Sequence, residues 1–215
     1  MRVVITGASR GIGAALAAAY DERGDTVVGT SRSGGAGLVP LDFDAAPDFA
    51  PLRDEVGAGA VDILVCNAGI YPDKGQPLAD GYPPEMWSRG LFVNVAGPFL
   101  TIQALLPALR RSSAPRIAIV SSAMGSQDRA PGGSYIYRAS KAAAVNLARN
   151  LARDLAPDSI AVGAYHPGWV RTEMGGAGAD IDAATSAGGL VSRIDRLTPE
   201  TTGVFETWDG QPIPF

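Results

Sequence analysis

The sequence predicts an α/β fold in which about seven parallel strands form one doubly wound sheet covered by helices on both faces. Short β-branched runs alternate with longer Ala- and Leu-rich segments from the start of the chain, at Val3–Thr6, Ile12–Arg23 and Thr26–Thr30, which is the pattern of βαβ units. The strand-like runs are continuously apolar, as in parallel strands that are buried on both faces. At 215 residues, the chain fits a single domain over residues 1–215.

Seven segments have the composition of buried strands. They are Val3–Thr6, Thr26–Thr30, Leu38–Leu41, Val61–Cys66, Arg116–Ser121, Ile160–Tyr165 and Gly203–Glu206. Two long helices are expected at Pro83–Arg110, with proline in its first turn, and at Ser134–Leu155, which ends before Pro157. The link from Arg32 to Leu38 is too short for a helical crossover, so no helix is expected there.

Charge and cysteine content restrict the class of protein. The net charge is −4 and no run of five like charges occurs, so neither nucleic acid nor a membrane surface is an expected partner. A single cysteine, Cys66, excludes an intramolecular disulfide and agrees with a reducing compartment. The chain starts directly on a strand, and apolar stretches such as Ala14–Tyr20 are too short to span a bilayer. We therefore expect a cytoplasmic protein, and with no metal-ligand spacing we expect no metal site.

A glycine-rich turn, Thr6–Gly13, links the first strand to the first helix. Glycine lets the backbone approach a pyrophosphate, and the free N–H groups of the helix N-terminus attract its charge. Such a turn alone is weak evidence, because glycine also ends strands, but its position between strand and helix favours a Rossmann-type dinucleotide site. The residues expected at the cofactor are Gly7, Ser9, Arg10, Gly11, Ile12 and Gly13.

The end of the second strand indicates which dinucleotide is bound. An acidic residue there holds the ribose of NAD, but this chain has Ser31 and Arg32. A guanidinium binds a 2′-phosphate bidentately, so NADP(H) is favoured while NAD(H) stays possible. Arg10 could add a second positive group, and Asp42 could accept from the adenine amino group. The alternative is that Arg32 is a solvated surface charge and Asp42 an exposed turn residue.

The order of the motifs resembles the short-chain dehydrogenase/reductase family. Thr6–Gly13 is followed by Asn67–Gly69 after the fourth strand, Tyr137–Lys141 on a helix and His166–Thr172 after the sixth strand. The resemblance covers the whole chain in order. Within the family, Tyr137–Ala143 and Trp169–Gly176 are most similar to the C-factor and sniffer-like carbonyl reductase group.

Tyr137 and Lys141 lie four residues apart, on one face of a helix. There the ammonium can lower the pKa of the phenol, which suits an acid that protonates an alkoxide. An exposed tyrosine and lysine on an amphipathic helix would look the same in isolation. The resemblance adds Ser122, with Ser121 as the other candidate, for the substrate oxygen, and Asn94 for a water-linked proton path to the lysine. The spacing from Ser122 to Tyr137 is longer than usual, so the loop between them must bulge.

The resemblance also assigns the remaining contacts. Tyr137 and Lys141 contact the cofactor as well as the substrate, and the further cofactor residues are Asn67, Ala68, Gly69, Pro167, Gly168, Val170 and Thr172. Asn67 is expected to be mainly structural, and Cys66 and His166 wholly so. A short lid over the substrate is expected at about residues 171–198, and the long helices are expected to form a homodimer or homotetramer.

The resemblance implies an NAD(P)-dependent oxidoreductase that transfers hydride reversibly between NADP(H) and a small carbonyl or alcohol substrate, with carbonyl reduction favoured. The substrate itself cannot be identified, because each candidate residue for a mainly apolar pocket is equally suited to core packing. These candidates are Tyr71, Tyr135, Met124, Trp169 and Met174. The alternative is a dinucleotide-binding signalling or sensor protein with little turnover. A hydrolase is disfavoured, because Ser122 and the single His166 lack a nucleophile elbow.

Overall fold

The computed structural model describes all residues, 1–215, and contains one seven-stranded parallel sheet. The strands are β1 (Arg2–Ile5), β2 (Thr26–Ser31), β3 (Val39–Pro40), β4 (Ile63–Cys66), β5 (Arg116–Val120), β6 (Ala161–His166) and β7 (Phe205–Thr207). Their order is β3-β2-β1-β4-β5-β6-β7, and every neighbouring pair is parallel. The predicted fold class is confirmed. Because the order reverses between β1 and β4, a crevice is expected at the carboxyl ends of these two strands.

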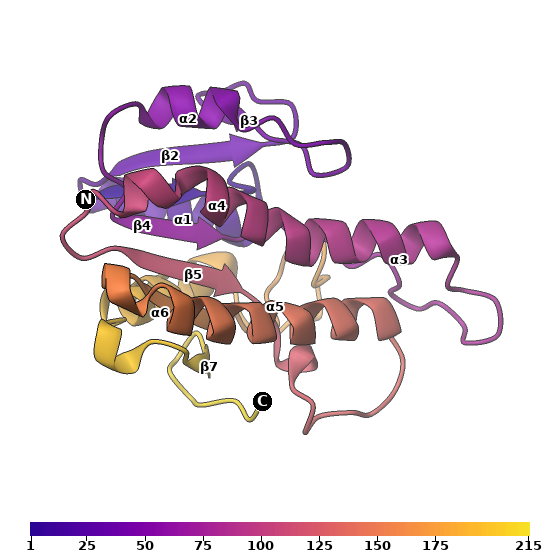
Figure 1. The fold of residues 1–215 in the computed structure, drawn as a ribbon. Helices are drawn as coiled ribbons and strands as arrows, with labels where there is room; N and C mark the ends of the chain where they lie inside the picture. Colours follow the sequence, from indigo (N-terminus) through magenta and orange to yellow (C-terminus); the bar gives the residue numbers. More distant parts are fainter.

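Helices cover both faces of the sheet (Figure 1). They are α1 (Gly11–Glu22), α2 (Ala50–Val56), α3 (Pro84–Leu91), α4 (Gly97–Leu109), α5 (Tyr135–Asp154) and α6 (Ala183–Asp195). One core cluster packs α2, α4 and α5 on one face, around Leu52, Leu105 and Ala144. A second cluster packs α1 and α6 on the other face, around Leu16 and Leu190. Short 3-10 helices lie at Ala123–Gly125, Ala156–Asp158 and Pro199–Thr201.

The helix predicted at Pro83–Arg110 is not a regular α-helix throughout, so that prediction was wrong in detail. A π-helical segment, Phe92–Ala96, separates α3 from α4. Pro98 follows it and has no N–H to donate to the carbonyl of Asn94, so an α-helical bond cannot form there. The stretch Pro84–Leu109 is long and apolar enough to cross a membrane by length and composition alone; 18 consecutive residues within it have a mean hydropathy of 1.5, and 44% of these are buried in this fold.

Two helices were not predicted. Helix α2 is short and begins at a proline-containing turn. Helix α6 lies inside the segment expected to form the lid, and Asp182 caps it by accepting a hydrogen bond from Thr185 N at 2.7 Å. The link between β2 and β3 contains no helix, as predicted, and turns through Gly34–Gly37 with four consecutive positive φ angles. Cys66 is buried in β4, and burial raises the pKa of its thiol to about 12.

Candidate active site

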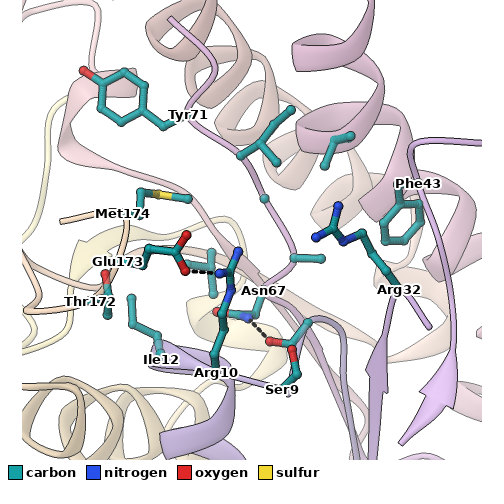
Figure 2. Close-up of a pocket in the computed structure, with 18 of the residues that line it drawn as sticks. Ser9, Arg10, Ile12, Arg32, Phe43, Asn67, Tyr71, Thr172, Glu173 and Met174 are labelled. Atoms are coloured by element: carbon teal, nitrogen blue, oxygen red, sulfur yellow. Dashed lines mark hydrogen bonds and ion pairs between the residues drawn. The ribbon is translucent and has the colours of Figure 1, made fainter. Parts of the chain in front are cut away.

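A cleft of about 830 Å³ opens at the carboxyl ends of the central strands (Figure 2). It runs from the end of β2, past the glycine-rich turn, to the first turns of α5. The cofactor residues expected from the sequence that line it are Gly7, Ser9, Arg10, Gly11, Ile12, Gly13, Ser31, Arg32, Asp42, Asn67, Ala68, Gly69, Tyr137, Lys141, Pro167 and Thr172. Gly168 and Val170 lie beside the cleft and are not part of its lining.

The glycine-rich turn presents the N-terminus of α1 to the cleft. No side chain caps this helix, so its first N–H groups stay free to bind an anion. Gly7 and Gly11 have φ angles of 70° and 57°, which favour glycine. A Cβ on Gly13 would lie 2.1 Å from the carbonyl oxygen of Gly7, so only glycine allows this close approach. The turn therefore fits the diphosphate of a dinucleotide.

Asn67 holds this turn against β4. Its side-chain amide donates to the carbonyl oxygens of Thr6 and Gly7 at 3.0 and 3.1 Å. The Thr6 hydroxyl in turn accepts from the backbone N–H groups of Asn67 and Ala68. These bonds fix the glycine-rich turn from behind, which agrees with the structural role expected for Asn67.

The adenosine end of the cleft carries more charge than the sequence indicated. Arg32 lies 3.5 Å from a carboxylate oxygen of Asp44, and Arg89 of α3 binds the same carboxylate through two hydrogen bonds of 2.6 and 2.9 Å. These ion pairs hold the pKa of Asp44 below its usual range. Asp42 lines the same end and turns to accept from Asp44 N at 2.8 Å. Two guanidinium groups thus flank one carboxylate where a 2′-phosphate would lie.

Tyr137 and Lys141 both face the cleft from α5 and are both nearly buried. The Lys141 ammonium donates to the carbonyl oxygen of Val120 at 2.9 Å and lies 5.7 Å from the centroid of the Tyr137 ring. Burial lowers the pKa of Lys141 to about 8, because desolvation disfavours its charged form. The lysine is thus close enough to favour a phenolate on Tyr137.

The Tyr137 phenol is shielded from water by a second aromatic ring. Tyr71 stacks on it with centroids 4.1 Å apart and an interplanar angle of 14°. Burial raises the pKa of Tyr137 to about 12, the neighbouring Ser122 hydroxyl lowers it, and Tyr71 raises it further. Tyr137 is therefore protonated at neutral pH, as a general acid must be.

Ser122, rather than Ser121, points toward the phenol. Ser121 lines the cleft, but its hydroxyl donates to the backbone oxygen of Lys141 at 2.9 Å. Ser122 is not among the lining residues; its hydroxyl lies near Tyr137 and accepts from Met124 N at 3.1 Å. The hydroxyl of Ser122 can donate to a substrate oxygen in this position.

Asn94 lies behind Lys141, in the π-helical segment. Its amide exchanges two hydrogen bonds with the backbone of Ile70, at 2.8 and 2.9 Å, and donates to Ser140. A Cβ on Gly69 would lie 3.2 Å from the Asn94 amide oxygen and 3.4 Å from the Lys141 ammonium. The Asn94 amide and the Lys141 ammonium thus both lie close to Gly69, just after the end of β4 and beside the N-terminal half of α5.

The segment after β6 meets the opposite wall of the cleft. Glu173 pairs with Arg10 of the glycine-rich turn, and the two side chains point toward one another in Figure 2. Lys74 donates to the backbone oxygen of Met174 at 3.1 Å. These contacts cross the mouth of the cleft.

Sequence reasoning missed several residues of this region. They are Asp44, Asp73, Lys74, Arg89 and Glu173. Their position in loops that follow strand ends is a signal that could have found Asp44, Asp73 and Lys74. Glu173 has the same signal, since it follows β6, whereas Arg89 lies in α3 and its partner Asp44 is 45 residues away. Of the proposed pocket residues, Tyr71 and Met174 line the cleft, while Met124, Tyr135 and Trp169 do not.

A parallel sheet with an uncapped glycine-rich turn beside a buried tyrosine and lysine defines a Rossmann-type dinucleotide-dependent oxidoreductase. Comparison with known proteins identifies the family. Residues 1–180 match the short chain dehydrogenase family. The chain belongs to this family and is an NAD(P)-dependent oxidoreductase.

Individual relatives agree with this assignment. A Myxococcus xanthus protein named C-signal is 38% identical over 161 residues, which are 74% of this chain and 96% of that protein. Among solved structures, the NADPH-bound carbonyl reductase from chicken fatty liver has a TM-score of 0.87 and 26% identity, and covers 100% of this chain and 98% of its own. The carbonyl reductase Sniffer of D. melanogaster also has a TM-score of 0.87, with 27% identity and coverage of 100% and 99%.

Proposed function

We propose that the chain reduces small aldehydes, ketones or quinones with NADPH, with Asn94, Ser122, Tyr137 and Lys141 as its catalytic set. The observation that carries this proposal is the buried Tyr137 and Lys141 pair, which shares one cleft with the glycine-rich turn. The similarity to carbonyl reductases of known structure supports the choice of substrate class.

Each side chain has one task in this mechanism. The bound dinucleotide would supply the hydride. Ser122 would donate a hydrogen bond to the carbonyl oxygen, and the Tyr137 phenol, protonated at neutral pH, would give that oxygen its proton. The Lys141 ammonium, 5.7 Å from the ring centroid, would stabilise the phenolate that remains. Asn94 would hold the start of a proton path from solvent to Lys141.

Replacing Tyr137 by phenylalanine tests the proposal. Loss of the acid should lower kcat at least about 100-fold, while the Kd for NADPH stays within twofold of the original value. Turnover is followed as NADPH oxidation with a panel of aldehydes, ketones and quinones that includes 4-nitrobenzaldehyde. Tyr20→Phe is the matched control, since Tyr20 lies on α1 and its hydroxyl is buried without a hydrogen-bond partner. An unchanged kcat in Tyr137→Phe would contradict the mechanism.

We further propose that NADPH is preferred over NADH. Arg32 and Arg89 would contact the 2′-phosphate at the adenosine end, and Asp44 would oppose it. Arg32→Ala should therefore weaken NADPH binding about tenfold with little effect on NADH, and Asp44→Asn should tighten NADPH binding. If Arg32→Ala weakened the binding of NADPH and NADH equally, Arg32 would not contact the 2′-phosphate.

The proposal extends to organisation. Residues 1–215 act as a single domain in the cytoplasm, and residues 171–198 act as a lid over a small-molecule substrate. Gly168 and Val170 would support the nicotinamide end from beside the cleft. A homodimer or homotetramer would form through α3, α4 and α5, where an apolar surface is exposed. We call this surface the helix face; its residues are Leu91, Phe92, Val95, Ala96, Phe99, Ala143 and Leu147.

A second candidate function is a signalling or sensor role in which the chain binds a dinucleotide with little turnover. The similarity to the Myxococcus protein named C-signal favours it. In that case NADPH would bind with ordinary affinity, no carbonyl of the panel would be consumed, and Tyr137→Phe would leave the biological role intact. The complete catalytic set argues for the reductase instead.

A further inference from the structure

The first turn of α5, which carries Tyr137, is held by a segment that lies far away in the sequence. Asp73, in the loop after β4, is fully buried. One of its carboxylate oxygens accepts from Ile136 N at 2.8 Å, and the other accepts from Tyr137 N at 3.2 Å. The carboxylate thus binds two free N–H groups at the positive end of the helix dipole.

Ser134 does not cap this helix, although serine at its position usually does. Its φ angle of 49° is left-handed, and its side chain makes no hydrogen bond to the helix. Its hydroxyl bonds instead to the Tyr71 hydroxyl at 2.5 Å. A left-handed conformation strains a non-glycine residue and persists only where surrounding contacts hold it. The entry to α5 is therefore set by residues of the β4 loop.

The same loop contacts the Tyr137 side chain. Tyr71 stacks on the phenol ring at 4.1 Å. Between Tyr71 and Asp73, Pro72 packs near α3 and α5: a Cβ on Gly90 would lie 2.5 Å from Ile136 Cγ2 and 3.4 Å from Pro72 Cγ. Tyr137 is thus held at its backbone by Asp73 and at its ring by Tyr71.

We propose that Asp73 is a positioning residue for the reaction, which fixes the Tyr137 phenol by binding the first-turn N–H groups of α5. Asp73 does not line the cleft, so it acts through Tyr137 and not on the substrate. Burying a carboxylate to cap a helix has a large desolvation cost. A serine cap from the same segment would be enough if the cap had only to stabilise the helix. A catalytic acid, however, must be held within about 0.5 Å of its productive position. The inference rests on the proposed role of Tyr137.

The test compares two isosteric substitutions. Asp73→Asn removes the charge and replaces one acceptor oxygen by an NH2 group, which cannot accept from a backbone N–H. Asp62→Asn is the matched control, because Asp62 also accepts from a backbone N–H, that of Arg2 at 2.8 Å, and from the Ser112 hydroxyl, at the opposite end of the sheet. Tm, the Kd for NADPH, kcat and the solvent deuterium isotope effect on kcat are measured with the best carbonyl of the panel.

Both variants should lose thermal stability, but only Asp73→Asn should lose kcat, by about tenfold to 100-fold. Its solvent isotope effect should rise, since proton donation by a displaced phenol becomes slower, while the Kd for NADPH stays within twofold. The proposal would be overturned if Asp73→Asn has a lowered Tm but a kcat, counted per NADPH-binding site, within twofold of that of the unsubstituted enzyme. A merely structural cap would give that result.

Two further variants keep the outcome decisive. If Asp73→Asn does not fold, Asp73→Glu keeps a carboxylate but lengthens the side chain by one CH2 group, which displaces the first-turn N–H groups that it binds. It should lower kcat at least threefold with the same rise in isotope effect; an unchanged kcat there overturns the proposal. Tyr137→Phe distinguishes a failure of the positioning role of Asp73 from a failure of the proposed mechanism. If it is inactive while Asp73→Asn is fully active, the positioning role alone fails. If Tyr137→Phe is fully active, the proposed mechanism itself fails.

Discussion

At the residue scale, Tyr137 and Lys141 are both removed from water, and burial shifts each toward its neutral form. The pKa of the phenol is raised to about 12 and that of the ammonium is lowered to about 8. Near neutral pH the tyrosine therefore holds its proton and the lysine still holds its charge, which is the combination that carbonyl reduction needs. With these pKa values, a rise in pH above neutral changes the protonation state of the pair, whereas a fall in pH does not.

The rate of reduction should accordingly fall as the pH rises through about 8. Below this value Lys141 is protonated, and Tyr137 stays protonated up to about 12. We expect kcat/KM for NADPH, which reports groups of the free enzyme, to be flat from pH 6 to 7.5 and to fall about tenfold per unit above pH 8. A rate that rises through pH 8 would mean that neutral Lys141 is the active form.

Lys141→Met should abolish turnover yet stabilise the fold near neutral pH. The pKa of Lys141 is about 8 in the folded chain and 10.5 in its reference state, so burying the ammonium costs up to about 3 kcal/mol below pH 8. The cost shrinks as the pH rises from 8 to 10.5, where the folded lysine has lost its proton and the unfolded one still holds it. The gain in Tm should therefore be largest at pH 7 and vanish near pH 10.5, as measured by thermal unfolding across this range.

How far the sequence determines the site depends on how local each contact is. The glycine-rich turn and the spacing of Tyr137 and Lys141 are local patterns, and both lie where predicted. Asp73 was missed because its partners on α5 lie 63 and 64 residues away, and the Asp44–Arg89 pair spans 45 residues. The residue pattern within a single segment does not indicate contacts between residues so far apart in the sequence.

At the scale of secondary-structure elements, two departures from regular patterns shape the cleft. The π-helical segment Phe92–Ala96 carries Asn94 toward Ile70 and Ser140, and Pro98 is a reason for it that could have been recognised from the sequence. Helix α6 was missed because Gly188 and Gly189 weaken its helical signal. The strands were predicted well, since their apolar runs are short and continuous.

Gly13→Ala should disrupt the junction of β1 and α1. The added Cβ would lie 2.1 Å from the Gly7 carbonyl oxygen and 2.5 Å from the Asn67 amide nitrogen, so backbone must move. We expect the Kd for NADPH to rise at least about tenfold, since the N–H groups of the turn lose their alignment, and Tm to fall. Gly188→Ala is the control: it lies in α6 with no atom within 4 Å of its added Cβ, and better helix propensity should raise Tm slightly. Unchanged NADPH binding in Gly13→Ala would contradict the role of the turn.

At the scale of the whole molecule, an apolar surface stays exposed on the outside of the helices that cover one side of the sheet. Helices α4 and α5 lie side by side over one side (Figure 1). The helix face, which also includes the end of α3 and the π-helical segment, leaves Leu91, Phe92 and Phe99 exposed at 38%, 36% and 41%. Grouped apolar side chains of this kind mark contacts between proteins. The face lies outside the cleft, so two copies could join without blocking either site.

Phe99→Glu should therefore convert the oligomer to a monomer. A charge at the centre of an apolar contact would remain unpaired and desolvated, while in the monomer it is solvated and harmless. Light scattering at micromolar concentration should show the mass of one chain, about 22.1 kDa, for the variant and a multiple of it for the unsubstituted protein. Leu78→Glu, at an exposed residue outside the helix face, should leave the mass unchanged. A monomeric unsubstituted protein would contradict the assembly.

The contacts across the mouth of the cleft also bear on the sequence of events in turnover. The Arg10–Glu173 pair and the bond from Lys74 to the Met174 backbone join the segment after β6 to both the glycine-rich turn and the β4 loop. We expect these contacts to open when a long dinucleotide enters or leaves the cleft, whereas a small carbonyl needs less room. Binding should therefore be ordered, with the dinucleotide first on and last off. Since Arg10 and Glu173 are exposed, salt screens their attraction, and rising ionic strength should speed the release of the dinucleotide.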